Sequence, residues 1–304
     1  AFHAVGRLWL REGNGRARAI SDRNDRFEYQ PAFSPDGTKL LFTTWNDETR
    51  GQVVERDLGN GTERVLTTTR GLYYGPRYSP DGQSVVFVRD SGNSMTGSAW
   101  GRDAGLYVMP AAGGEARKIA DNGREPQFND DGSRVLYLSG GGLSKKLLSV
   151  GLHGEQPREV LDLKYVDAVS VSPDGKQVAF TELFNAYVAP LPETGGSIAL
   201  SKDTKAVPVT ALTTQVGAYL HWSDANSLHW MAGGKYVSRD VDAARDDGGV
   251  AIAPSVAVDT PTETVAITGG RVVTMRDAET TQEVIEDGVV LVRGDRIVAV
   301  GRRG

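Results

Sequence analysis

FSPDGTKLLFTTW, residues 33–45, is the stretch that decides the fold, because similar stretches return four more times along the chain. The copies read YSPDGQSVVFVRD at 78–90, FNDDGSRVLYLSG at 128–140, VSPDGKQVAFTEL at 171–183 and, in weaker form, WSDANSLHWMAGG at 222–234. Successive copies are 45, 50, 43 and 51 residues apart, close to the period of roughly 40 to 50 residues that marks β-propeller blades. The sequence therefore predicts one structural unit repeated around a ring.

Within each copy, an apolar strand end runs into a Ser-Pro-Asp-Gly-type turn and then into an alternating strand, such as the one that carries Val85 and Phe87. Proline presets φ, aspartate bonds to nearby backbone and glycine accepts a positive φ, so the tetrapeptide closes a tight turn. A second hairpin is expected downstream, with strands at Gly105–Met109 and Ala116–Ala120. Because four strands per repeat characterise propeller blades, the predicted fold is all-β. It is a propeller of about five to six four-stranded blades, complete or incomplete, with a small C-terminal β-sandwich fragment.

Two series of repeated residues have both a structural and a functional interpretation. The turn carboxylates could be calcium ligands, but no repeat supplies the dense alternating oxygens of a calcium loop, so we interpret them as turn-forming. The aromatic residues that precede the turns are interpreted as packing between neighbouring blades rather than as a ligand cage. The carboxylates are Asp36, Asp81, Asp131 and Asp174, and the aromatic residues are Phe33, Tyr78, Phe128 and Trp222.

Composition excludes several classes of function. The net charge is −5 and the pI is about 5.5, and no basic stripe follows the chain, so nucleic acid is not an expected partner. No apolar run reaches the about 18 residues of a membrane-spanning helix, and the N-terminal AFHAVGRLWL lacks the parts of a signal peptide. The chain has no cysteine, which excludes disulfides and thiol catalysis without deciding the compartment.

The repeats resemble those of the TolB-like propeller family, which carry the same strand–Ser-Pro-Asp-Gly–strand unit, and the resemblance covers about residues 1–245. We assign residues 1–250 to this propeller. The resemblance implies a protein-binding platform, a substrate gate on a peptidase or an N-terminal appendage of a hydrolase, in a periplasmic or secreted parent protein. The resemblance specifies the fold more than the function.

If the propeller binds a protein or a peptide, the surface expected to do so is the mouth of its central funnel, lined by residues just before each innermost strand. These positions mix aromatic rings with both signs of charge, whereas ordinary loop variation is the alternative. They are Tyr29, Gln30, Tyr73, Tyr74, Arg124, Glu125, Asp167 and Tyr219.

Both ends of the chain predict incomplete units. Residues 2–20 match the outer half of a blade and lack the inner hairpin, while the last repeat has an inner pair near Tyr219–Trp222 and Leu228–Met231 and an uncertain outer strand. Either the N-terminal half blade completes the last repeat, or an upstream segment completes a sixth blade. An open ring would expose strand edges, which favour association.

The pattern changes after a linker at 251–263, and residues 264–304 predict strands of a second β domain. The stretches 267–273, 287–292 and 295–301 resemble the N-terminal strands of amidohydrolases, in which a small β-sandwich flanks a metal-bearing (β/α)₈ barrel. The resemblance implies an amidohydrolase barrel in cis as the partner of the propeller. It also implies a divalent metal, zinc by family, in that barrel and no cofactor in this chain.

No catalytic residue and no metal ligand is assigned within the chain. The family's chemistry needs a His-X-His pair, and the four histidines, His3, His153, His221 and His229, form no such pair. Serine peptidase chemistry is excluded because no Gly-X-Ser-X-Gly occurs. His221, His229 and Asp224 could be drawn as a metal site, but without a second shell of partners we interpret them as structural.

Two functions remain open from the sequence. The first is a noncatalytic propeller portion of a metal-dependent amidohydrolase, a C–N hydrolase, where it acts as scaffold or substrate gate. The alternative is a TolB-like protein-binding module without an enzymatic role. A purely structural propeller with no ligand is a third possibility.

Overall fold

The computed structural model describes residues 1–13, 15–90, 103–214, 216–243, 248–258, 260–275 and 283–303. Every regular element in these ranges is a β-strand. Within them, no helix is long and apolar enough to cross a membrane. The chain divides into two compact units, Ala1–Pro254 and Ser255–Gly304, and the first unit extends to strand β24 at Val250–Ala251.

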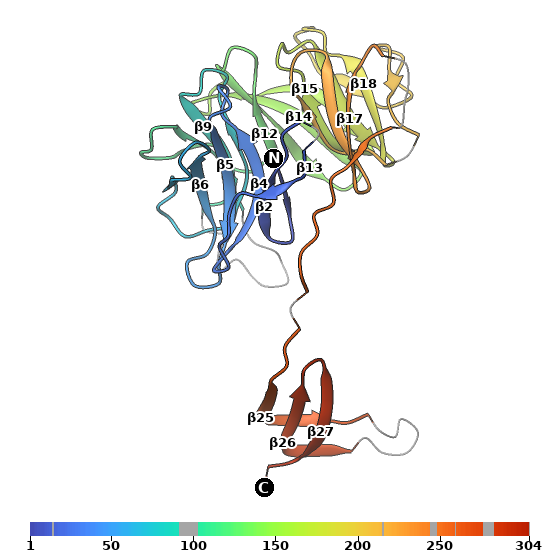
Figure 1. Ribbon diagram of the computed structural model, residues 1–304. Helices are drawn as coiled ribbons and strands as arrows, with labels where there is room; N and C mark the ends of the chain where they lie inside the picture. The colour runs from blue at the N-terminus through green and yellow to red at the C-terminus, as the bar shows by residue number, and fades with distance from the viewer. Residues whose placement is uncertain are drawn as a thin grey trace. The chain divides into compact units, whose positions relative to one another are not determined.

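The first unit consists of a three-stranded sheet followed by five blades, which appear in chain order from blue to orange in Figure 1. The N-terminal sheet contains β1 (Phe2–Ala4), β2 (Arg7–Leu10) and β3 (Arg18–Ala19). Blade 1 contains β4 (Phe27–Phe33), β5 (Lys39–Trp45), β6 (Gln52–Asp57) and β7 (Glu63–Val65), and blade 2 contains β8 (Tyr73–Tyr78), β9 (Ser84–Arg89), β10 (Gly105–Pro110) and β11 (Arg117–Ala120).

The remaining blades follow the same antiparallel order. Blade 3 contains β12 (Arg124–Phe128), β13 (Arg134–Gly141), β14 (Ser144–Gly151) and β15 (Arg158–Lys164), with β19 (Ile198–Leu200) added in parallel on its outer edge. Blade 4 contains β16 (Val166–Val171), β17 (Gln177–Glu182), β18 (Asn185–Pro190) and β20 (Thr210–Ala211). Blade 5 contains β21 (Ala218–Trp222), β22 (Ser227–Ala232), β23 (Lys235–Asp240) and β24.

These sheets confirm the all-β propeller that the repeats predict. The last repeat pairs with its own outer strands β23 and β24, so the N-terminal strands do not complete it. The N-terminal sheet has a third strand, β1, where the sequence predicted only two. It matches the three outer strands of a blade and lacks a counterpart of the innermost strand.

The hydrophobic core is divided into layers between consecutive sheets. Leu40 and Phe42 of β5 pack toward the N-terminal sheet, whereas Leu41 of the same strand packs toward blade 2. Alternate residues of a strand point to opposite faces, so one central strand contributes to two layers. The same arrangement joins blades 2 and 3, 3 and 4, and 4 and 5.

The aromatic residues before the turns pack between blades, as predicted, with one exception. Tyr78 donates to Glu55 Oε2 of blade 1 at 2.6 Å, and Trp222 donates to the Ser170 carbonyl of blade 4 at 3.0 Å. Phe128 packs against the layer between blades 2 and 3. Phe33 is 44% exposed, because its neighbour is the N-terminal sheet rather than a full blade.

The turn carboxylates hold the turns together, which confirms the structural interpretation. Asp36 Oδ1 accepts the Ser34 hydroxyl at 2.6 Å and the Thr38 N–H at 3.1 Å, and Ser34 Oγ in turn accepts the Lys39 N–H at 2.9 Å. These bonds lower the pKa of Asp36 to about 2. The same hydroxyl-to-carboxylate bond recurs at Ser79 and at Ser172.

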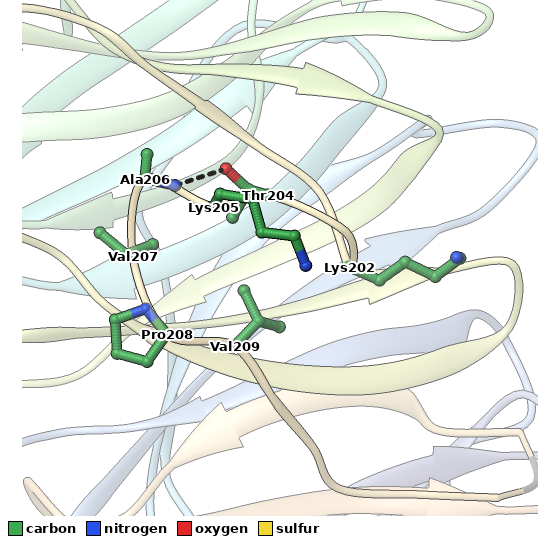
Figure 2. Close-up of a pocket in the computed structure, with 7 residues that line it drawn as sticks. All are labelled: Lys202, Thr204, Lys205, Ala206, Val207, Pro208 and Val209. Carbon is green, nitrogen blue, oxygen red and sulfur yellow. Dashed lines mark hydrogen bonds between the residues drawn. The ribbon is translucent and has the colours of Figure 1, made fainter.

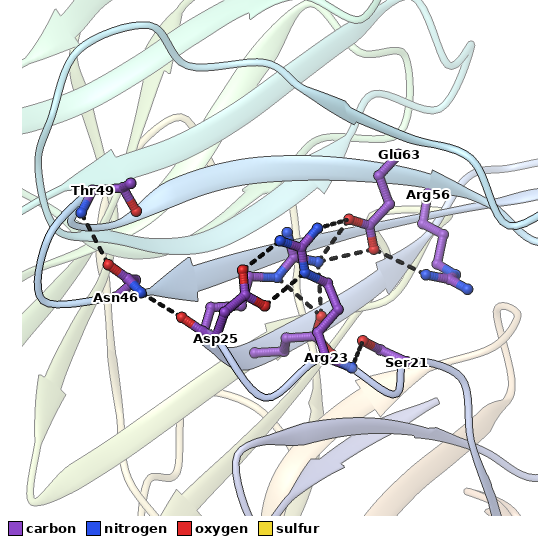
Figure 3. A network of polar contacts seen from close by, with 9 residues as sticks. Ser21, Arg23, Asp25, Asn46, Thr49, Arg56 and Glu63 are labelled. Carbon is purple, nitrogen blue, oxygen red and sulfur yellow. Dashed lines mark hydrogen bonds and ion pairs between the residues drawn. The ribbon is translucent and has the colours of Figure 1, made fainter.

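A partly buried ionic network ties the segment before β4 to the strands of blade 1 (Figure 3). The Arg26 guanidinium, with its side chain 9% exposed, pairs with Glu28 at 2.8 Å and with Glu63 at 2.7 Å. Glu63 also pairs with Arg56 at 2.9 Å. Because each buried charge has an opposite charge within contact distance, the desolvation cost is offset, and the segment that enters blade 1 is held against β6 and β7.

The second unit is a three-stranded antiparallel sheet of β25 (Thr264–Val273), β26 (Val284–Arg293) and β27 (Arg296–Arg302). Gly294 joins β26 to β27, whereas Asp287 and Gly288 lie within β26, where the pairing with β25 shifts register. The polar stretch 276–282 lies outside the described residues.

We predict that Gly82→Ala destabilises the propeller by about 1 kcal/mol, because Gly82 has a φ of 71° and an L-residue pays a conformational cost in that region. A Cβ there would meet only Pro35, at 3.6 Å, so steric clash does not contribute. Gly141→Ala is the control, since no atom lies within 4 Å of its Cβ position and its φ is not left-handed. Urea unfolding of both variants checks the difference, and equal midpoints would contradict it.

Candidate functional site

A β-bulge interrupts the innermost strand of every blade at nearly the same place. The pairing with the second strand shifts register between Tyr29 and Ala32 in blade 1, and at the equivalent position in blades 2, 3 and 5. In blade 4 it shifts slightly earlier, between Val166 and Ala168. Bulges bend a strand and redirect its side chains. Positive φ angles mark the bulge at Gln30 (53°), Gly75 (56°), Glu125 (52°) and Tyr219 (57°).

Side chains at the bulges bond to the main chain of the next blade. Gln30 Oε1 accepts the Gly75 N–H at 2.8 Å, and Glu125 Oε2 accepts the Val169 N–H at 3.4 Å. Gln127 Oε1 accepts the Val171 N–H at 3.1 Å. These bonds give partners to backbone N–H groups of the next innermost strand, so the three side chains connect neighbouring blades.

The structure places all eight predicted funnel residues within the innermost strands, rather than just before them. Tyr73 differs from the other seven because it is 3% exposed and packs edge-on against Phe87, with ring centroids 5.6 Å apart. Tyr73 belongs to the core because its neighbour Tyr74 takes the opposite face of the strand. The seven that line the mouth are Tyr29, Gln30, Tyr74, Arg124, Glu125, Asp167 and Tyr219.

Several of the mouth residues have partners that hold their side chains. The Asp167 carboxylate accepts the Lys145 ammonium at 3.4 Å, and the same ammonium donates to the Val166 carbonyl at 2.7 Å. Arg124 Nη1 donates to the Gly140 carbonyl at 3.2 Å. Desolvation raises the pKa of Tyr74, which keeps its hydroxyl protonated. The mouth therefore presents aromatic rings, the acidic groups of Glu125 and Asp167 and the basic group of Arg124.

Two further channel residues, Arg77 and His221, were missed as a pair by sequence reasoning. Both stand two residues before the turn serine of their repeats, and both side chains are exposed to solvent. Desolvation lowers the pKa of His221 to about 4, with a further lowering by the charges of His229 and Arg77. Arg77 is in blade 2 and His221 is in blade 5, and each stands on the innermost strand of its blade. Repeat alignment could have shown the shared position.

The histidines once considered for a metal form a stacked pair instead. His221 and His229 have ring centroids 5.0 Å apart and an interplanar angle of 17°, and His229 Nδ1 lies 2.7 Å from the Tyr236 hydroxyl. Asp224 accepts the Asn226 and Ser227 N–H groups at 2.8 and 2.7 Å within the turn. In the described residues, no three His, Asp or Glu side chains converge as metal ligands.

Exposed apolar side chains gather at the end of the blades where the innermost strands begin, which we call the mouth face. The turn after β17 lies there, because Glu182 at the end of β17 pairs with Val166 at the start of β16. Hydrogen bonds connect the loops, from the Tyr165 N–H to the Leu143 carbonyl at 2.9 Å and from the Gly217 N–H to the Phe184 carbonyl at 2.9 Å. The apolar rim comprises Leu143, Tyr165, Leu183, Phe184, Val216 and Tyr219.

Four rim residues are held in the left-handed backbone region. Their φ angles are 62° at Tyr165, 48° at Leu183, 72° at Phe184 and 57° at Tyr219. Bulky L-residues rarely adopt such angles, and the strain they cost is often kept at functional sites. Phe184 is 71% exposed and Tyr219 is 74% exposed. The strained backbone positions therefore carry large apolar side chains that face solvent.

A hollow of about 370 Å³ elsewhere on the first unit carries no comparable arrangement (Figure 2). Its lining residues all come from one segment, 202–209, between β19 and β20. The Lys202 ammonium is paired with Asp203 at 2.6 Å. Since side chains from different strands do not converge there, the mouth face is the stronger candidate site.

We predict that His221 makes folding sensitive to mild acid. Its pKa is about 4 in the folded chain and 6.5 without the fold. Between these values the unfolded chain binds more protons, so stability falls as the pH falls from about 6.5 to 4. The melting temperature of His221→Gln should therefore fall less than that of the wild type when the pH is lowered from 7 to 4.5. His153→Gln, at an exposed histidine of blade 3, is the control and should follow the wild type; a similar loss in all three proteins would contradict the prediction.

Known proteins share this architecture. The chain is 29% identical over 114 residues to the uncharacterized peptidase YuxL of Bacillus subtilis (strain 168), covering 35% of this chain and 16% of the relative. It is 27% identical over 82 residues to the Tol-Pal system protein TolB of Rickettsia prowazekii (strain Madrid E), covering 27% and 18%. The chain thus spans less than a fifth of either curated relative.

Solved structures show the same fold. TolB from Acinetobacter baumannii matches with a TM-score of 0.52 and 20% identity, over 73% of this chain and 53% of that chain. Putative TolB from Agrobacterium tumefaciens matches with a TM-score of 0.51 and 16% identity, over 94% and 84%. Residues 7–192, more than half of the chain, match the family described as the TolB beta propeller domain. The chain therefore belongs to the TolB beta propeller domain family.

Proposed function

We propose that the propeller is a noncatalytic module that binds a polypeptide segment of another protein or domain at its mouth face. The observation that carries this proposal is the apolar rim, because large apolar side chains on strained turns are costly unless they are covered. Loops presented by a rigid scaffold are the usual place for recognition. The rigid scaffold here is the set of bulged innermost strands that support the rim.

The chemistry of the mouth suits a polypeptide better than a small polar ligand. Exposed aromatic rings contribute large contact areas at interfaces, and Tyr29, Tyr74 and Tyr219 stand on three different blades. Arg124 and Asp167 add one charge of each sign between them, which supports specificity and orientation. The Tol-Pal name of the matched relative supports placing the protein in the periplasm or outside the cell.

We predict that Phe184→Asn weakens polypeptide binding about tenfold or more, because it removes a large apolar contact worth on the order of 1.5–3 kcal/mol. Asparagine tolerates the left-handed backbone at this position, so the fold should persist. The probe is a set of peptides selected from a random phage-displayed library on the immobilised chain, with affinities then measured by fluorescence anisotropy.

The matched control is Val65→Ser on outer strand β7, where Val65 is 47% exposed. Selected peptides should bind this variant as they bind the wild type. A library that yields no binders, or binders with equal affinity for Phe184→Asn and the wild type, would contradict binding through the apolar rim.

A second candidate function is favoured by the C-terminal sheet. Val265, Val292 and Ile297 are aligned across its three strands, as are Ile267, Val290 and Val300. One face of the sheet is therefore apolar, and Ile297 is 66% exposed on it. A three-stranded sheet needs such a face covered for stability. This supports our proposal that β25–β27 begin the β-sandwich of an amidohydrolase domain, for which the propeller is scaffold or substrate gate.

The proposed hydrolase chemistry would belong to a barrel beyond these residues. A divalent metal, zinc by family resemblance, would activate water there. The sequence contains no His-X-His pair, so none of its residues is assigned to hold that metal.

We predict that the coding sequence after Gly304 encodes a His-X-His pair at the end of a first barrel strand. The purified chain of 304 residues should then show no amidase activity above background when zinc is added, because it supplies no metal ligands. A stop codon at this boundary, or metal-dependent amidase activity of the chain itself, would overturn the amidohydrolase proposal and leave the binding proposal intact.

A further inference from the structure

One connection of blade 4 leaves its own blade and joins the neighbouring one. Residues 191–209 run from the end of β18 to the start of β20, two strands that pair with each other in blade 4. Between them, β19 adds in parallel to β15, the outer strand of blade 3. Of the five blades in the described residues, blade 3 alone has a fifth strand. We call residues 191–209 the strap.

The strap is anchored in the apolar layer between blades 3 and 4. Leu200 is 2% exposed and belongs to the same buried cluster as Leu161 and Leu163 of β15. Both blades contribute to this cluster, and further strap residues pack against it, including two on the return segment that Figure 2 shows. These residues are Leu191, Ile198, Val207 and Val209. Since burial of apolar area is the dominant force that holds elements together, the strap is fixed to both blades at once.

The strap reaches the mouth face at the end of β19. Strand β15 runs toward the mouth, because Lys164 at its end is followed directly by Tyr165 of the apolar rim. Strand β19 is parallel to β15 and pairs Leu200 with Leu163. The strap residues that follow Leu200 therefore emerge at the base of the rim.

A buried hydrogen bond joins the strap to the rim turn of blade 4. Glu182 is 3% exposed and stands at the end of β17, directly before Leu183 and Phe184 of the apolar rim. Its Oε2 accepts the Lys202 N–H at 2.6 Å. Hydrogen bonds to charged groups are stronger than those between neutral groups, and a buried carboxylate that loses a donor is costly. This bond therefore holds the strap against the base of the turn.

The two rim loops need support from outside, because their backbone is strained. Tyr165, Leu183 and Phe184 have positive φ angles, and such strain persists only where the surrounding structure holds it. The β19 ladder ends beside Leu163, two residues before Tyr165, and the bond to Glu182 lies one residue before Leu183. The strap thus connects the bases of two loops that belong to different blades.

We propose that the strap and Glu182 position the apolar rim for polypeptide binding. The strap locks the base of the Tyr165 loop in blade 3 to the base of the Leu183–Phe184 turn in blade 4, so a ligand does not have to order them. Preorganisation of this kind increases affinity, because less conformational freedom is lost on binding. The inference rests on the proposed binding function and adds the device that keeps its surface ready. Leu200 and Glu182 are buried, so they act through the rim rather than by touching the ligand.

The first test is amide hydrogen exchange in the free chain, measured by nuclear magnetic resonance. The Tyr165 N–H donates to the Leu143 carbonyl and the Gly217 N–H donates to the Phe184 carbonyl, so both amides report on opening of the rim. Both should exchange about tenfold faster or more in Leu200→Ala than in the wild type, because local opening is easier once the strap loses its buried anchor.

Leu66→Ala is the matched control for this substitution. Leu66 is 4% exposed and packs between blades 1 and 2, so its truncation lowers the urea midpoint as well but leaves the strap intact. The Tyr165 and Gly217 amides should exchange in this variant as they do in the wild type. Equal acceleration of these amides in Leu66→Ala and Leu200→Ala would show a global effect and overturn the proposal.

The second test measures the affinity of the peptides selected on the chain. Leu200→Ala and Glu182→Ala should each weaken binding about fivefold, the effect of having to order one or two side chains on binding, whereas Leu66→Ala should bind as the wild type does. Glu182→Gln keeps an oxygen that accepts the Lys202 N–H, so it should retain both the affinity and the slow exchange of the wild type. Equal losses in Glu182→Gln and Glu182→Ala would overturn positioning through this hydrogen bond.

The results also separate the strap from the binding function. If the peptides depend on Phe184 but bind Leu200→Ala and Glu182→Ala as they bind the wild type, the strap proposal fails and the mouth-face function stands. If no peptide depends on Phe184, the mouth-face function fails, and faster exchange of Tyr165 and Gly217 in Leu200→Ala would still show that the strap holds the rim. Unchanged exchange of both amides would overturn the strap proposal whatever the peptides do.

Discussion

The structure depends on apolar packing between consecutive sheets. A blade is thin, and its central strands are buried on both faces, as Val85 and Val86 of β9 show by their complete burial in different layers. Neither face can be covered without a neighbour, because alternate residues point to opposite sides. Each blade is therefore stable only as part of the series, and the hydrogen bonds of Tyr78 and Trp222 across the layers set how the blades are aligned.

The innermost strands have to change direction at the axis, and the bulges accomplish this. Each bulge breaks the regular ladder and leaves backbone groups that need other partners. Gln30, Glu125 and Gln127 supply these partners from the preceding blade. Neighbouring innermost strands are consequently joined by side-chain to main-chain bonds as well as by the apolar layers.

The two ends of the innermost strands differ, because one end carries the turns that stabilise the blade and the other carries the residues proposed for binding. The turn end of a repeat is built from Ser-Pro-Asp-Gly chemistry that recurs nearly unchanged, and its carboxylates are occupied by local hydrogen bonds. The opposite end varies from blade to blade and carries the apolar rim at positive φ angles. A propeller can thus keep one set of contacts for assembly and present another for recognition.

The sequence by itself determined the repeat, the turn chemistry, the number of blades to within one and the family, since period and turn residues depend on local backbone preferences. It also indicated the innermost strands as a candidate surface, and all eight predicted residues lie in those strands. Only the tertiary structure decided that Tyr73 is core while Tyr74 is not, that the last blade uses its own outer strands, and that Leu183 and Phe184 join Tyr219 in one patch. The reason is that alternation along a strand specifies only which residues share a face, whereas the packing of neighbouring blades decides which faces are covered.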